Sequence, residues 1–277
     1  MNLFETMRLD NGEIPRLAYH AERLQRASTV LGLPFDDIKW QQTIQQLCET
    51  YAVGQYRVKV TLEPSGELRT EVGTLQKTTT MTAQFVPMKN GIPEWQRVYK
   101  TSEREHVAHS HMTQLALFYD ETTNKVLEFD IGNVVLTVDG IHYTPIFDHD
   151  FLQGCMRRDL LAEARIKEKY LTTVMVKEAL QHGGQLWMIN SLREWVPITL
   201  ESKKVGDCMI GLYILGFLIV MWIGQIVSQR FVARQRRLWV YLWMGGILII
   251  QCMLIYGFVG ELAQHMREIL SLFYDEK

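Results

Sequence analysis

The sequence has few cysteines, and their spacing excludes two common uses of this residue. The 277 residues contain four, at Cys48, Cys155, Cys208 and Cys252, and no two of them form a C-x-x-C pair. A disulfide framework or a structural zinc site would need closely patterned cysteines. We therefore expect a protein of a reducing compartment with neither feature.

The sequence also lacks a charge excess and a leader-like start. Its formal net charge is −2, and no basic stretch is interleaved with aromatic residues, which argues against nucleic acid as a partner. The first residues, MNLFETMRLDNG, contain no apolar stretch behind a basic start. A secretory signal is therefore not expected.

Long hydrophobic runs are absent up to about residue 205, but two follow. Residues 208–227 and 238–259 each contain a single Gln and no charged residue. Roughly 20 apolar residues suffice for a helix to cross a bilayer. Two buried core helices are the alternative, but segments that are apolar on every face need lipid or a much larger core. We predict a tail, 201–277, of two transmembrane helices.

The preceding part of the chain predicts a small α/β lobe over residues 1–90. Asp-Asn-Gly within residues 3–17 indicates a hairpin turn. Helical spacing predicts a helix over 17–31 and a second, capped by Asp36 or Asp37, up to about Tyr51. Residues 55–63 and 80–88 are predicted strands, and 88–95 resemble a linker.

A second lobe is predicted over residues 91–200. Residues 126–146 indicate three strands, the last two joined by an Asp-Gly turn. Residues 154–170 form an amphipathic helical pattern with a glycine before it. Residues 171–180 and 185–200 would supply the last strands and their connection.

Three charged residues of this soluble part could carry chemistry. Lys100 ends the apolar-leaning run EWQRVYK, and a lysine that forms an imine must be neutral near pH 7. Arg23, on the first helix, could pair with a phosphate. Glu128 ends an apolar strand, where a carboxylate needs a cationic partner if it is buried. Each residue could equally be an ordinary surface residue.

Two further features suit an anion. In LQGCMRRDL a glycine leads into a helix, whose first N–H groups can bind a phosphate. Ser191, in INSLREW, offers a hydroxyl donor. Together, the arginine, lysine, carboxylate, helix start and hydroxyl are the groups needed to hold pyridoxal phosphate.

The order of these motifs resembles a known family. FET-x-R-x-x-x-G (4–12), L-x-x-H-x-x-R-L (17–24), Lys100, LEFDIGN (127–133), L-x-G-x-x-R (152–157) and INSLREWVPI (189–198) are similar to the class IV aminotransferases, the fold-type IV pyridoxal phosphate enzymes. Within them the chain most resembles the 4-amino-4-deoxychorismate lyases. The resemblance implies an α+β fold of two lobes, like that of D-amino-acid aminotransferase, and a homodimer.

The resemblance also implies roles for single residues. Lys100 matches the lysine that condenses with the cofactor and moves protons, Arg23 the phosphate ligand, and Glu128 the partner of the pyridine nitrogen. Cys155 and Met156 fall where two backbone amides hold the phosphate. Ser191 falls where a Thr, Ser or small residue sits, and Asn133 matches an Asn with a structural role.

The implied activity is the conversion of 4-amino-4-deoxychorismate to 4-aminobenzoate and pyruvate, a step of folate synthesis. Branched-chain aminotransferases usually carry a tyrosine five residues after the lysine, where this chain has Glu105; Arg104, four residues after it, also occurs among lyases. A branched-chain or D-amino acid aminotransferase is the alternative.

A third reading is a catalytically degenerate membrane protein, because only three residues precede Phe4, where family members carry a further strand. The small lobe is therefore expected to be shortened.

The histidines in HVAHSH, at His106, His109 and His111, mimic a metal pattern, but we expect packing or substrate contact instead.

For the tail, the arginine-rich link 228–237 favours the cytoplasm, which would place the enzyme on the opposite side of a simple hairpin. Because the cofactor and substrate are expected inside the cell, we predict a cytoplasmic catalytic part anchored to a membrane.

Overall fold

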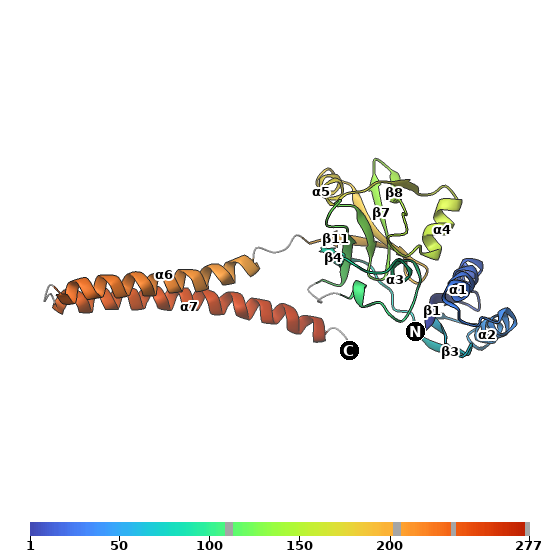
Figure 1. Ribbon diagram of the computed structural model, residues 1–277, viewed down its shortest axis with the longest axis horizontal. Coiled ribbons are helices and arrows are strands. Elements are labelled where there is room, and N and C mark those ends of the chain that lie inside the picture. Colours follow the sequence, from blue (N-terminus) through green and yellow to red (C-terminus); the bar gives the residue numbers. More distant parts are fainter. Residues whose placement is uncertain (109–112, 202–205, 234–236, 275–277) are drawn as a thin grey trace. The chain divides into compact units, whose positions relative to one another are not determined.

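The computed structural model describes residues 1–108, 113–201, 206–233 and 237–274 (Figure 1). The chain divides into two compact units, Met1–Ser202 and Lys203–Lys277. The first unit contains both predicted lobes, and the second contains the apolar tail.

The N-terminal lobe is a three-stranded antiparallel sheet with two helices. Its order is β1-β2-β3, and its elements are β1 (Leu3–Asp10), α1 (Leu17–Leu31), α2 (Asp37–Thr50), β2 (Gln55–Leu62) and β3 (Leu68–Thr74). Alternate residues of β1 are buried, as expected for a strand with one apolar face. That face packs with Leu24, Trp40 and Ile44 of the helices. Asp36 caps α2 as predicted, accepting from the backbone N of Ile38 at 3.0 Å.

The hairpin predicted within residues 3–17 is reduced to its turn. Asn11 and Gly12 have positive φ, as this turn type requires, but only the bridge Asp10–Glu13 follows. β1 instead pairs with β2 along its whole length. The reason is that β2 offers an eight-residue apolar-alternating partner, whereas residues 13–17 contain Pro15 and cannot continue a ladder.

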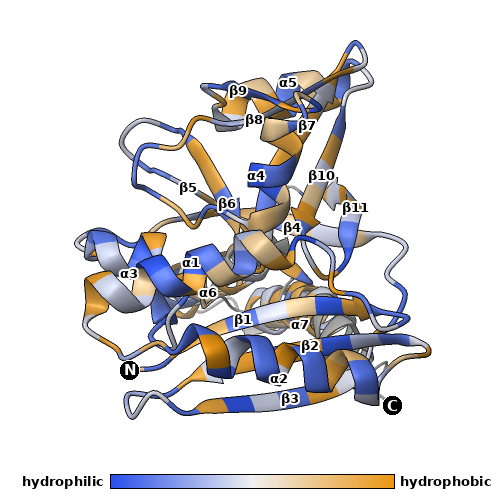
Figure 2. Ribbon diagram, turned by 90° about the vertical axis from the view of Figure 1, so that its right-hand side faces the viewer, coloured by the Kyte–Doolittle hydropathy of each residue, from blue (hydrophilic) through white to orange (hydrophobic). Residues whose placement is uncertain are grey.

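The second lobe is an eight-stranded sheet that closes into a barrel. Its strand order is β10-β11-β4-β5-β6-β7-β8-β9, and β10 also pairs with β7. The strands are β4 (Met81–Pro87), β5 (Leu115–Tyr119), β6 (Val126–Phe129), β7 (Gly132–Val138), β8 (Ile141–Pro145), β9 (Lys167–Lys169), β10 (Gln185–Asn190) and β11 (Glu194–Leu200). Figure 2 shows hydrophobic colour along β5 and β10. The barrel interior is a core of buried aliphatic residues around Phe129.

Strand β4 belongs to this barrel, although residues 80–88 are predicted as part of the small lobe. It lies between β11 and β5, parallel to both. The barrel therefore begins before the expected linker at 88–95. That segment leads into the short helix α3 (Glu94–Val98), and a 3₁₀ turn, η1 (Glu105–Val107), follows Lys100.

Two further helices lie outside the barrel. α4 (Cys155–Ala162) is shorter than the predicted helix 154–170, because Ala164 takes a positive φ and residues 167–169 pair with β8 instead. α5 (Thr173–Gln181) forms where residues 171–180 suggest a strand or connection. The Thr172 hydroxyl caps α5 by accepting from the backbone N of Met175 at 3.2 Å, which favours a helix despite the β-branched residues.

The second unit consists of α6 (Gly206–Ala233) and α7 (Arg237–Tyr274), which run side by side in opposite directions (Figure 1). Glycines allow the close approach: a Cβ on Gly224 would collide with Ile247, and one on Gly257 with Tyr213. Segments Leu212–Arg230 and Leu238–Gly260 are long and apolar enough to cross a membrane, by length and composition.

Candidate active site

A cavity of about 300 Å³ lies between the small sheet and the barrel. This volume is at the lower end of the range for small-molecule sites. Both lobes contribute to its wall, and its charged lining residues are Arg23, Arg57, Lys100, Arg104, Glu128, Asp130 and Arg193.

Five of the six predicted site residues line this cavity: Arg23, Lys100, Glu128, Cys155 and Ser191. They come from α1, the segment after α3, β6, α4 and the β10–β11 turn, so the fold gathers residues from both lobes. Met156 does not line the cavity. Its side chain packs with Val135, Leu160 and Ile189, on the other side of α4. A phosphate contact by its backbone amide stays a prediction.

Arg23 is held by a buried acid. Its Nε and Nη2 donate to the two oxygens of Glu5 at 2.7 and 2.5 Å, and its Nη1 donates to the carbonyl of Gln153 at 3.1 Å. Burial raises the pKa of Glu5, but the charges of Arg23 and His20 outweigh it, so this pKa lies well below its ordinary value. The guanidinium, with five N–H groups, keeps donors for an anion while its plane is fixed.

Lys100 follows α3, in a segment that pairs with the start of β1 in the other lobe. Its carbonyl accepts from the backbone N of Phe4 at 3.1 Å, and its Nζ lies 5.3 Å from the centre of the Phe4 ring. Burial lowers the pKa of Lys100 to about 8, and the positive charge of Arg23 adds to the effect. An appreciable fraction of the amine is therefore neutral near neutral pH, as a nucleophile or base must be.

Glu128 lies on β6, directly opposite Asn133 of β7. Its Oε1 accepts from the backbone N of Leu152 at 3.3 Å. Burial raises the pKa of Glu128 to about 7, although the charge of Arg104 lowers it. A cationic ring nitrogen beside this carboxyl would favour its ionised form.

The start of α4 forms a polar end of the cavity. Asn133 holds it: its Oδ1 accepts from the backbone N of Gly154 at 2.8 Å, and its Nδ2 donates to the carbonyl of Leu152 at 2.8 Å. Asn133 thus has the structural role that the resemblance implies. Ser191 and His20 also line the cavity, and the Ser191 Oγ and His20 Nε2 are buried without a hydrogen-bond partner among the described residues. Unpaired buried polar atoms beside a helix start indicate a place for a polar ligand.

Glu5, His20 and Cys155 also approach one another as metal ligands would, within 4.8 Å. Both Glu5 oxygens already accept from Arg23, and one also contacts His20 Nδ1 at 2.6 Å. A cation there would compete with the guanidinium. Of the three histidines in HVAHSH, His106 is buried beside Val107 outside the cavity lining; His109 and His111 lie outside the described residues.

Several residues in and around the cavity were not singled out from the sequence. Glu5 does not line the cavity but holds Arg23 in place. Glu5 has a readable signal: it occupies the buried phase of β1 with Leu3 and Met7, where a charge demands a partner. Arg57 and Arg193 carried no such signal in the sequence. Arg57, for example, occupies a position typical of the polar face of an ordinary strand. Only the fold brings them onto one wall.

The amino-transferase class IV family matches residues 2–115 and 104–200 of the sequence. Together the two matches span more than half of the chain. The chain therefore belongs to the class IV aminotransferases, a family of pyridoxal-phosphate-dependent enzymes. No curated protein matches the sequence.

Solved structures share the fold at low identity. A protein from Mesorhizobium loti provisionally named an amino-acid aminotransferase is 24% identical, with a TM-score of 0.63 over 72% of this chain and 99% of that one. A provisionally named 4-amino-4-deoxychorismate lyase from Haemophilus somnus is 17% identical, with a TM-score of 0.58 over 70% and 97%. A hypothetical aminotransferase from Mycobacterium tuberculosis in its PLP-bound form is 18% identical, with a TM-score of 0.60 over 72% and 81%.

The cavity fits the family's cofactor. It offers a lysine whose pKa is depressed, an arginine and a helix start for a phosphate, and a buried carboxyl for a ring nitrogen. The unpaired Ser191 hydroxyl supplies a further donor. These groups line one cavity, which is the arrangement that pyridoxal phosphate requires.

Proposed function

We propose that this enzyme converts 4-amino-4-deoxychorismate to 4-aminobenzoate and pyruvate, a step of folate synthesis. The observation that carries the proposal is the surplus of arginines on the substrate side of the cavity. Arg23 donates to Glu5 and is assigned to the cofactor phosphate, and the charge of Arg104 acts on Glu128. Arg57 and Arg193 remain for the substrate.

Two arginines suit a substrate with two carboxylates. Arg193 donates its Nε to the Thr78 hydroxyl at 3.2 Å, which leaves its terminal nitrogens to the cavity. Burial lowers the pKa of Arg193, and the positive charge of Arg57 adds to it, so an anion between them would be stabilised. Aminodeoxychorismate carries two carboxylates, whereas a branched-chain amino acid carries one and an apolar side chain.

When bound, pyridoxal phosphate supplies an aldehyde that condenses with amines and a ring that accepts the electron pair of a broken bond. The chain's own residues do the rest. Arg23 and the start of α4 would hold the phosphate, and Glu128 would keep the ring nitrogen protonated. Neutral Lys100 Nζ removes the proton from the amine-bearing carbon and returns a proton to the enolpyruvyl methylene, as the ether bond breaks and pyruvate leaves.

The test is turnover by the full chain. Purified protein with cofactor should form 4-aminobenzoate, detected by fluorescence, and an equal amount of pyruvate. The Lys100→Ala variant should lose this activity, its visible absorption band and covalent labelling after borohydride reduction. Amino-group transfer between an amino acid and a keto acid without any 4-aminobenzoate would instead establish the aminotransferase. Binding of cofactor without either reaction would indicate a degenerate relative.

We also propose that α6 and α7 anchor a cytoplasmic catalytic unit to a membrane, and that the enzyme is a homodimer, as the family resemblance implies. Apolar side chains support the anchor: Leu212, Trp222, Leu242 and Met253 are each more than half exposed in the second unit. Contiguous exposed apolar surface of this kind requires a lipid or protein partner. The full chain should float with phospholipid vesicles in a density gradient and resist extraction by carbonate. Recovery in the soluble fraction would refute the anchor, and light scattering in detergent measures the oligomer.

A further inference from the structure

The two lobes beside the cavity meet through backbone pairing of Leu3 with Thr101, through packing of Tyr99 on the small lobe's apolar cluster, and through polar side-chain contacts. Apart from Tyr99, that cluster consists of small-lobe residues, and the barrel has clusters of its own. Polar side chains also cross the seam between the lobes. Arg158 of α4 donates to Glu22 of α1 at 2.8 Å, and Arg23 donates to the carbonyl of Gln153.

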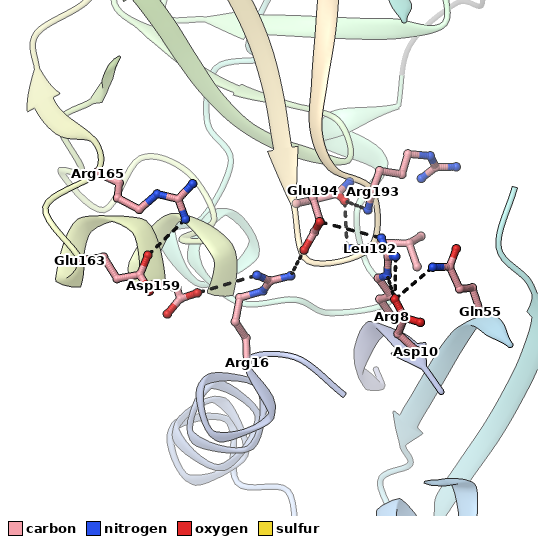
Figure 3. A network of polar contacts seen from close by, with 11 residues as sticks. Arg8, Asp10, Arg16, Gln55, Asp159, Glu163, Arg165, Leu192, Arg193 and Glu194 are labelled. Atoms are coloured by element: carbon pink, nitrogen blue, oxygen red, sulfur yellow. Dashed lines mark hydrogen bonds and ion pairs between the residues drawn. The ribbon is translucent and has the colours of Figure 1, made fainter. Parts of the chain in front are cut away.

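The largest of these seam contacts centres on Glu194, the first residue of β11 (Figure 3). Its Oε1 accepts from Arg16 Nη2 at 3.1 Å, and its Oε2 lies 3.9 Å from Arg8 Nη1. Both arginines belong to the small lobe. Arg16 also lies 3.8 Å from Asp159 of α4, so one arginine meets two acids of the barrel lobe.

The backbone at both ends of this pair is unusual. Arg16 has φ +63° and Glu194 has φ +61°, a region that favours glycine. Neither position carries glycine, so each retains a side chain at a conformational cost. The two side chains that bear this cost bind each other.

The turn before Glu194, residues 190–193, forms part of the cavity wall. Asn190 makes the turn rigid: its Oδ1 accepts from the backbone N of Leu192 at 3.0 Å and of Arg193 at 2.7 Å. Inside the turn lie Ser191 and Arg193, both lining the cavity. A rigid turn still needs a fixed position relative to Arg23 on the opposite lobe, and the Glu194 contacts supply one.

We propose that Glu194 is a positioning residue, whose ion pair with Arg16 holds the Ser191–Arg193 turn in register with Arg23 across the seam. This inference rests on the assignment of the cavity as the cofactor site, but not on the identity of the substrate. The exposed fractions matter here: the Arg16 side chain is only 12% exposed and that of Glu194 44%, so salt screens the pair incompletely.

A matched control lies close by in the same view (Figure 3). Glu163 and Arg165 form an ion pair at 3.3 Å within the barrel lobe, with side chains 52% and 59% exposed. This pair does not cross the seam. Glu163→Gln therefore removes the same charge without touching the connection between the lobes.

The experiment is equilibrium titration of the full-length protein, freed of cofactor, with pyridoxal phosphate at low and high salt. Glu194→Gln should weaken binding about tenfold at low salt, since a small displacement of a positioned group has a large effect. Wild-type binding should fall toward the variant's as salt rises, while Glu163→Gln should bind like the wild type. Arg16→Gln breaks the pair from the other side and should match Glu194→Gln.

Circular dichroism and thermal unfolding of the same samples separate positioning from folding. A lower melting temperature with unchanged cofactor affinity in Glu194→Gln would overturn the proposal, as would an equal loss in Glu163→Gln. If Glu194→Gln does not fold, Arg16→Gln decides by the same criterion. Failure of the wild type to bind cofactor would instead remove the site assignment and the inference with it.

Discussion

Replacing Glu128 by glutamine should have opposite effects on the cofactor-free and cofactor-bound enzyme. Glutamine keeps the shape of the side chain and can still accept the hydrogen bond from the backbone N of Leu152. It cannot ionise. In the cofactor-free protein the pKa of Glu128 is raised by burial from 4.5 to about 7, and this difference corresponds to about 3 kcal/mol of disfavour for the ionised form.

The sign of the pH dependence follows from where the proton resides. Above pH 4.5 the unfolded chain releases the Glu128 proton, while the folded protein keeps it up to about pH 7. The folded state binds more protons in this window, so its stability falls as pH rises through it. The glutamine variant has no such decline. Its free energy of unfolding should differ least from the wild type near pH 5 and exceed it by about 3 kcal/mol near pH 8.

Bound cofactor should reverse this order, because a protonated ring nitrogen makes the ionised carboxylate favourable and the variant loses that partner. The assay is urea unfolding in detergent, with and without pyridoxal phosphate, at several pH values. Glu121→Gln, at an exposed position between β5 and β6, is the control. A gap between Glu128→Gln and the wild type that stays constant from about pH 5 to about pH 8, or a cofactor-free variant less stable than the wild type near pH 8, would refute the reasoning.

Three further outcomes are expected. The rate of covalent attachment of pyridoxal phosphate to Lys100 should rise with pH, reach half its maximum near pH 8 and then level off, because burial lowers the pKa of this lysine to about 8. Stopped-flow absorbance measures this rate, and a rate that still climbs steeply well above pH 8 would contradict the lowered pKa. Arg23→Met should destabilise the protein by about 3–5 kcal/mol, since it leaves the buried Glu5 charge without its guanidinium partner. Adding Glu5→Gln should recover much of that loss in thermal unfolding, whereas additive losses would speak against the pair. Gly154→Ala should place a Cβ against Asn133 Oδ1, which lowers the free energy of unfolding by about 1–3 kcal/mol and weakens cofactor binding. Hydrogen exchange should change around residue 154 and stay unchanged around the exposed Gly183.

The sequence is most informative where a polar residue interrupts an apolar pattern. Arg23, Lys100 and Glu128 were recognisable because their order along the chain matches the chemistry of one cofactor. The structure shows that all three line the same cavity. Their roles toward the cofactor stay predictions.

Features that depend on distant partners could not be predicted in the same way. β4 pairs with β11, more than a hundred residues later, and no local pattern encodes that contact. The helix α5 shows a different limit: its residues Thr173, Val174 and Val176 favour a strand, but the Thr172 cap and the apolar face against the barrel decide for a helix. Met156 illustrates a third limit of prediction from the sequence. Its neighbour Cys155 lines the cavity, but one step along α4 turns the next side chain away from it.

The position of β11 has a consequence for synthesis in the cell. β4 cannot gain its second neighbour until residue 198 has been made, and the first apolar helix begins at Gly206, only a few residues beyond the end of that strand. With the proposed membrane anchor, closure of the barrel and delivery of the tail to a lipid phase are therefore nearly simultaneous events for the nascent chain. Slow pairing of distant parallel strands leaves the two processes in competition, so the order in which they finish governs the yield of active enzyme.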